Sequence, residues 1–187
     1  RWRFVQTLDW TRSFGKHDLG ALVGYEAIRN WGFNTDMAKQ GAADASLTDL
    51  STYTELSNIT GTTWENTSRS FFGRLTYAYK SRYLFEVNAR YDGSSRFAPE
   101  SRWGFFPSFS GGWRVSEESF MQGSPFDNLK IRLSWGKLGN NSIGDYEWQA
   151  TYSGSNYIFG DKLTSGLAQT VIANQKLRWE SVTQTNI

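Results

Sequence analysis

The chain has 187 residues, with 20 basic and 18 acidic side chains, one histidine and no cysteine. This balanced charge gives no basic field for a phosphate backbone and argues against nucleic acid as a partner, while the lack of cysteine removes disulfide scaffolds and zinc–thiolate sites. No window holds the roughly 18 consecutive apolar residues of a membrane helix, and mean hydropathy is −0.55. A membrane β-barrel stays open, because its strands alternate apolar and polar residues.

Apolar and polar side chains alternate with a period of two in most of the chain, which predicts antiparallel β-strands. The clearest case is Tyr83–Tyr91, whose intervening positions carry charged and amide side chains. The expected strands are Trp2–Trp10, Leu19–Ala27, Phe71–Tyr79, Tyr83–Tyr91, Phe105–Val115, Leu129–Trp135 and Trp179–Ile187. Pro107 removes a backbone donor, so we expect an edge, a bulge or a strand end at that position.

The connections alternate in length. Phe14–Asp18 and Lys80–Arg82 are short, Gly93–Arg102 is longer, and Asn30–Glu65 is a long polar stretch without a sustained period. Ser116–Ser119 has a helix-start pattern. Short turns alternating with long loops, and aromatic residues near the ends of apolar faces, are typical of outer-membrane barrels. A soluble β-sandwich is the alternative that composition and spacing leave open.

Another alternation covers Tyr146–Tyr152, and the period is lost from Gly154 to Gln175. We place both stretches in a long excursion between the last two expected strands.

Four motifs follow one another in the second half of the chain. They read RYDGSSRFAPESRWGFFPSFS from Arg90, GGWRVSEESFM from Gly111, LKIRLSWGKLGNNSIGDY from Leu129 and LRWESVTQTNI from Leu177. In this order they resemble the SusC/RagA family of TonB-dependent outer-membrane transporters of Bacteroidetes. The resemblance covers about Phe71 to Ile187, whereas the segment before Arg69 matches only in pattern.

The resemblance implies an all-β fold: a transmembrane antiparallel β-barrel segment with about seven strands of a barrel of roughly 22. Residues 1–187 would be part of the barrel domain, with the plug, the TonB box and the closing strand outside this chain. Family members import glycans or peptides across the outer membrane. The implied partners are a SusD-like surface lipoprotein, TonB acting through the absent N-terminal part, outer-membrane lipid, and an oligosaccharide or peptide substrate. No cofactor is implied, and the alternative function is a soluble carbohydrate-binding module.

The motif Asp92, Gly93, Ser94, Ser95, Arg96 places a carboxylate beside hydroxyls. We interpret it as a structural turn in which the glycine has positive φ and Arg96 pairs with Asp92. No second carboxylate or histidine is placed for acid–base work, so we expect no enzyme and no catalytic residue. Glu117 and Glu118 fit a charge pair at a helix end. A lone His17 makes no metal site.

Two further sets of residues are candidates for contact with a substrate. Charged residues on polar strand faces are expected to face the lumen, where packing against the plug or plain solvation is the simpler role; they are Arg3, Arg74, Glu86, Arg90, Lys130 and Arg132. Aromatic residues in predicted extracellular loops are candidates for stacking on sugars or seating a lipoprotein lid, with packing within the loops the alternative; they are Trp31, Phe33, Tyr53, Trp64, Tyr157 and Phe159. Strand parity makes the short turns periplasmic and places Asn30–Glu65, Gly93–Arg102 and Leu138–Lys176 outside the cell.

Overall fold

The computed structural model describes residues 1–42, 44, 46 and 48–187, and these form β-structure with no α-helix. The strands are β1 Trp2–Phe14, β2 His17–Ala42, β3 Tyr53–Tyr79, β4 Tyr83–Ser94, β5 Trp103–Arg114, β6 Lys130–Asn140, β7 Thr151–Phe159, β8 Lys162–Val171 and β9 Glu180–Asn186. Four short 3-10 turns are η1 Leu50–Thr52, η2 Pro99–Ser101, η3 Val115–Glu117 and η4 Ser119–Met121. The expectation of an all-β chain is confirmed.

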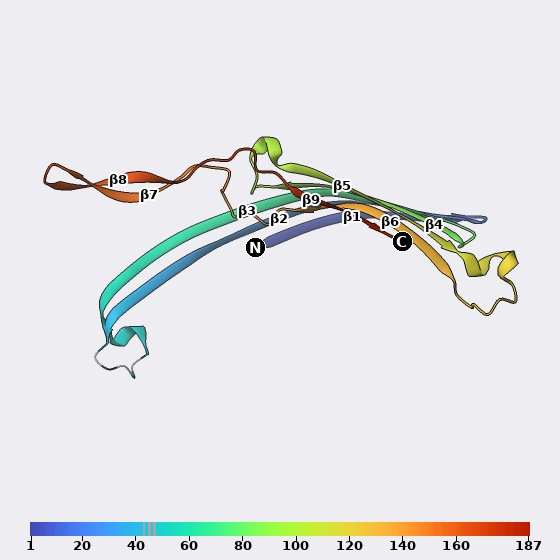
Figure 1. Cartoon of the computed structure of the whole chain (residues 1–187), viewed down its shortest axis with the longest axis horizontal. Helices are drawn as coiled ribbons and strands as arrows, with labels where there is room; N and C mark the ends of the chain where they lie inside the picture. The colour runs from blue at the N-terminus through green and yellow to red at the C-terminus, as the bar shows by residue number, and fades with distance from the viewer. Residues whose placement is uncertain (43, 45, 47) are drawn as a thin grey trace.

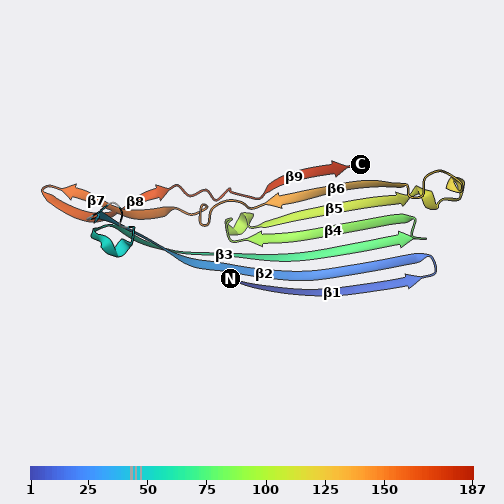
Figure 2. The same ribbon diagram turned by 90° about the horizontal axis from the view of Figure 1, so that it is seen from below.

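Seven strands make one antiparallel sheet in the order β1-β2-β3-β4-β5-β6-β9, while β7 and β8 form a separate hairpin. Figure 2 shows the seven strands side by side with the β7–β8 hairpin extending away from them, and Figure 1 shows the sheet edge-on as a single curved layer. The few buried apolar side chains, such as Phe97 and Val115, do not form the core of a sandwich. The described residues therefore contain no second sheet packed on the first.

The pairing register gathers apolar side chains on one face of the sheet, which we call the apolar face. Leu75 lies between Ala21 and Val87, and it is 61% exposed. Other members of this face are Leu8, Leu19, Val23, Phe85, Phe109, Ile131 and Leu133. An exposed apolar surface of this extent needs a non-aqueous surrounding.

Two aromatic rows bound the apolar face. One row holds Tyr79, Tyr83 and Trp113, with Tyr79–Tyr83 and Tyr83–Trp113 ring centroids 6.3 Å and 6.5 Å apart. The other holds Tyr25, Phe71, Tyr91 and Phe105 in register. Tyr83 and Tyr91 are eight residues apart on β4, or about 26 Å along the strand, which matches the apolar band of roughly 25 Å in membrane barrels.

The turns Gly15–Lys16 and Lys80–Arg82 lie at one end of the strands, which we call the short-turn edge (Figure 1). Gly15 has φ of 61°, and Lys80 and Ser81 have φ of 51° and 53°, as hairpin turns with the favoured twist require. The Lys80 amide donates to the Lys16 carbonyl at 2.7 Å, so the neighbouring turns are tied together. Both short connections are confirmed.

The third connection at this edge carries the helix-start pattern at Ser116 and was expected to be a short turn anchored by Phe120 and Met121. The segment forms only the turns η3 and η4. Glu118 accepts hydrogen bonds from the Tyr83 hydroxyl at 2.7 Å and from Trp113 Nε1 at 3.1 Å. Together with Arg82, these donors lower the pKa of Glu118. Glu117 pairs separately with Arg114 at 3.0 Å, so the two carboxylates do not act together.

The opposite end of the strands is the long-connection edge, and here the expected structureless loop Asn30–Glu65 is wrong. The β2–β3 ladder continues to Ala42 and Tyr53, far beyond Ser68, where β4 begins to pair with β3. We call this projecting part the hairpin extension. Its many threonines suit strands, but its two faces do not separate into apolar and polar, so no period was visible. Residues 43, 45 and 47 of the predicted loop lie outside the described residues.

The predicted loop aromatics consequently lie on strands. Trp31 and Phe33 are in β2, Trp64 and Tyr53 are in β3, and the last two of the set, Tyr157 and Phe159, are in β7. The alternation at Tyr146–Tyr152 does not correspond to a strand over these residues. Residues 145–148 form turns, and β7 begins only at Thr151.

The strand end expected at Pro107 is found on the side of β6 but not on the side of β4. Pro107 pairs with Ala89 of β4, but the β5–β6 ladder starts at Ser108, so the missing donor falls where β5 and β6 separate.

We predict that this chain, excised and transferred to water, does not give a soluble monomer, because its apolar face and the strand edges of β1 and β9 promote association. Size-exclusion chromatography and far-UV circular dichroism of the excised chain check this. A monomer that unfolds cooperatively in urea would contradict the single-layer arrangement.

Candidate functional site

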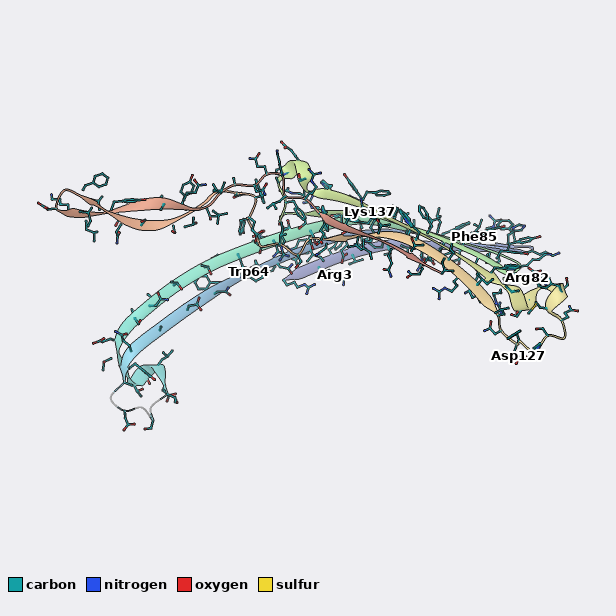
Figure 3. All side chains as sticks on the ribbon, in the orientation of Figure 1. Arg3, Trp64, Arg82, Phe85, Asp127 and Lys137 are labelled. Atoms are coloured by element: carbon teal, nitrogen blue, oxygen red, sulfur yellow. The ribbon has the colours of Figure 1, made fainter. Side chains whose placement is uncertain are left out.

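The charged residues singled out from the sequence share the face opposite the apolar one, which we call the polar face. Glu86 pairs with Thr76 and Ser110, and the register extends this face across the sheet. Its members include Arg3, Arg74, Glu86, Arg90, Lys130 and Arg132. Figure 3 shows Arg3 and Phe85 on opposite sides of the curved sheet.

A charge cluster occupies the part of the polar face nearer the long-connection edge. Glu26, only 9% exposed, accepts a hydrogen bond from Arg3 Nε, and its other oxygen lies 3.8 Å from Arg90 Nη2. Arg90 also pairs with Asp92 at 3.0 Å. Two cations and two carboxylates thus cancel and link β1, β2 and β4. Glu26 was not among the predicted residues, although its polar position between apolar neighbours marked it.

Nearer the short-turn edge, the polar face carries a groove of about 800 Å³. Lys130 and Arg132 line it together with Asp18 and Glu86. Among the described residues, no acidic oxygen lies within 4.0 Å of the Lys130 or Arg132 nitrogens. The groove therefore offers hydrated charges of both signs, which suits polar molecules.

The motif at Asp92–Arg96 differs from the predicted turn. Asp92 to Ser94 close strand β4, and the turn begins at Ser95. The expected Arg96–Asp92 pair is wrong: Arg96 Nε donates to Asp145 Oδ1 at 2.8 Å, while Asp92 pairs with Arg90. The strand directs Asp92 to the polar face, and the chain leaves the strand before it reaches Arg96.

Gly93 is required for space and not for a positive φ. It lies opposite Trp103, and a Cβ at this position would be 2.8 Å from the Trp103 ring. The Trp103 ring in turn stacks on Tyr91 with centroids 4.8 Å apart.

Asp145 is the centre of a polar cluster at the long-connection edge, which we call the rim cluster. Besides Arg96, it accepts a hydrogen bond from Asn66 Nδ2 at 3.0 Å. Asn141 donates to Ser94 Oγ at 3.3 Å, and the Arg96 guanidinium reaches the Asn141 carbonyl. These bonds tie the connection after β6 to the middle of β3 and to the end of β4. Asp145, Asn66 and Asn141 were not predicted from the sequence, although Asn141 and Asp145 lie within the motif that begins at Leu129.

An aromatic cluster lies beside these bonds. Phe97 is fully buried, and its ring centroid is 5.3 Å from that of Trp179, which also contacts Phe106 at 5.2 Å. A Cβ on Gly139 would lie 2.1 Å from the Phe106 ring. The Phe106 ring thus fills the space where β5 and β6 are no longer paired.

The single histidine serves a structural contact. His17 Nδ1 lies 2.8 Å from the Tyr77 hydroxyl, and its ring stacks on Phe14. Within the described ranges, no group of three or more metal-ligating side chains gathers. No described helix is long and apolar enough to cross a membrane.

We predict that Gly139→Val destabilises the full-length parent protein by about 1–3 kcal/mol, because the added side chain displaces Phe106. Gly154→Val is the matched control, since a Cβ on Gly154 meets nothing within 4 Å. The urea midpoint, followed by heat-modifiable electrophoretic mobility, checks both. Equal midpoints for the two variants would show that Phe106 does not need this space.

Comparison with known proteins assigns this chain to a family. A family model described as TonB dependent receptor-like, beta-barrel, matches residues 1–187. The chain is 35% identical over 185 residues to the TonB-dependent receptor SusC of Bacteroides thetaiotaomicron, and 33% identical over 183 residues to the TonB-dependent receptor P3 of Formosa agariphila. Each alignment covers 96% of this chain and 18% of the relative.

Solved structures agree with the sequence relatives. The RagAB peptide transporter matches with a TM-score of 0.84 and 30% identity, covering 98% of this chain and 20% of that one. The chain thus spans about a fifth of the length of its relatives. The expected barrel segment and outer-membrane location are confirmed, and the chain belongs to the β-barrel domain of TonB-dependent receptors of the SusC/RagA type.

Proposed function

We propose that this chain forms part of the wall of an outer-membrane importer, with its apolar face toward lipid and its polar face toward the lumen. The observation that carries the proposal is the single-layer sheet, with an apolar face bounded by two aromatic rows and charged groups on the other face. Residues 1–187 are then barrel domain, and the plug, the TonB box and the closing strand belong to other parts of the protein.

The proposed cargo is a polar oligomer, either an oligosaccharide or a peptide. The groove supports this because its lining residues Lys130, Arg132, Asp18 and Glu86 carry both signs of charge and form no close ion pair in the part of the chain that the structure describes. The relative RagAB is a peptide transporter, which makes a peptide the first cargo to test. The relatives are receptors and transporters, and we propose import without catalysis.

The proposed outer partner is a SusD-like lipoprotein seated at the long-connection edge, and TonB would act through the part of the protein outside this chain. Exposed aromatic side chains on the hairpin extension and β7 support this, with Phe33 67% and Phe159 71% exposed. At the base of the extension, Arg29 donates to both oxygens of Glu65 at 2.8 Å and holds the two strands together. This pairing lowers the pKa of Glu65.

Import is tested by expressing the full-length parent in cells that lack it, with and without TonB. Uptake of fluorescent peptides or oligosaccharides is expected only with both proteins, because energy comes from TonB. Hydrolysis of the probe that continues without TonB would indicate an enzyme instead. Release of the parent from membranes by a carbonate wash would indicate a soluble binding module.

The orientation gives a second prediction. Cysteines placed at the exposed positions Ser57 and Ser165 of the parent should react with an impermeant maleimide on intact cells, whereas one at Ser81 should react only after lysis. Equal expression of the three variants, measured by immunoblot, is the control. Labelling of Ser81 alone on intact cells would show that the short-turn edge faces outward.

A further inference from the structure

A small cavity of about 320 Å³ lies at the long-connection edge, outside the groove and the rim cluster. Its lining combines two arginines, hydroxyl side chains and an indole ring: Thr67, Ser68, Arg69, Gly93, Ser95, Arg102 and Trp103. The side chains of Arg69 and Arg102 belong neither to the groove on the polar face nor to the rim cluster.

Neither guanidinium has an acidic partner. Among the described residues, no carboxylate oxygen lies within 4.0 Å of Arg69 or Arg102, whereas Arg29 and Arg96 are both paired. Arg102 Nε is also buried without a hydrogen-bond partner. A buried charged donor without an acceptor is energetically costly. A ligand oxygen that accepts a hydrogen bond from Arg102 Nε would therefore stabilise this site.

Two guanidinium groups lining one small cavity favour an oxyanion with several acceptor oxygens. Arginine binds phosphate through parallel N–H···O bonds, and a hydroxyl such as that of Ser95 can add a further donor. The chemistry of the lining therefore selects a phosphate group.

The register shows which surface the cavity adjoins. Arg69 pairs with Gly93, and Gly93 with Trp103, so these residues form the next row on the apolar face beyond Phe71 and Tyr91. The Trp103 ring stacks on Tyr91 and lies 6.2 Å from the Phe71 ring centroid. Aromatic rows of this kind lie at headgroup level, so the cavity lies where lipid phosphates are found.

We propose that Arg69 and Arg102 bind the phosphate of a phosphorylated glycolipid in the outer leaflet. Free phosphate presents the same oxygens, but the adjacent apolar face accommodates acyl chains that only a lipid has. This proposal rests on the orientation proposed above, which places the long-connection edge outside. Because Ser95 also bonds to Thr67, the bound headgroup adjoins the base of the rim cluster.

The test is native mass spectrometry of the detergent-purified full-length parent, titrated with monophosphorylated lipid A. We compare the wild type with Arg69→Gln and with the double variant R69Q/R102Q. Arg74→Gln is the matched control, because Arg74 is equally exposed and unpaired but lies on the polar face. Heat-modifiable mobility verifies that each variant is folded, and the single variant at exposed Arg69 keeps the test valid if the double variant does not fold.

We expect one lipid A to bind the wild type and R74Q alike, and at least about tenfold weaker binding to R69Q, which corresponds to about 1.4 kcal/mol. Dephosphorylated lipid A should bind the wild type as weakly as monophosphorylated lipid A binds the double variant. Equal affinity of R69Q and wild type would overturn the proposal. Full competition by millimolar inorganic phosphate would also overturn it, in favour of a free-anion site.

Phosphatidylglycerol separates this proposal from the orientation on which it rests. Preference for that phospholipid over lipid A would overturn the outer-leaflet assignment. The cysteine labelling would then show independently whether the barrel itself is inverted.

Discussion

The cross-strand register is the constraint on which the other features of this sheet depend. Side chains alternate between faces, so a slip of one residue between two strands would move charged groups into lipid and apolar groups into the lumen. The backbone hydrogen bonds alone do not select one register. Close contacts between glycines and rings do, because Phe72 occupies the space beside Gly24 and Trp103 the space beside Gly93. Each of these contacts exists in one register only.

The same register determines which charged side chains pair with one another and which remain exposed. At Glu26, where the polar face is buried from solvent, opposite charges lie in contact and cancel. Where the face opens into the groove, Lys130 and Arg132 remain without close acidic partners among the described residues. Burial thus separates a part of the polar face in which the charges are paired from a part in which they are exposed to water. The pairing between strands, rather than the choice of residues alone, produces this separation.

Sequence reasoning reached the strands whose two faces differ. Period-two alternation located β4 and the short turns beside it, because one face of this strand is apolar and the other is polar. This alternation did not reveal the strands of the hairpin extension, because both of their faces mix polar and apolar residues. It also predicted a strand too early before β7, because the turn residues there alternate in polarity. Periodicity reports a difference in environment, and such a difference is absent from these segments.

The long-range contacts of the site could not be predicted from the sequence for a different reason. The Arg96–Asp145 pair joins residues 49 positions apart, and the choice between Asp92 and Asp145 depends on where the chain leaves β4. Gly93 was correctly marked as special, but its reason lies in Trp103, a neighbour on another strand. A motif read along one strand does not contain that neighbour.

The hairpin extension has a mechanical consequence. Ala42 lies 13 positions beyond Arg29, a span of about 43 Å in an extended strand. A rigid arm of that length amplifies motion, so a rotation of about 10° at its base displaces the tip by about 7 Å over such a span. The bidentate Arg29–Glu65 pair lies at the pivot. A change in the geometry of this base is therefore largest, in absolute displacement, at the far end of the arm.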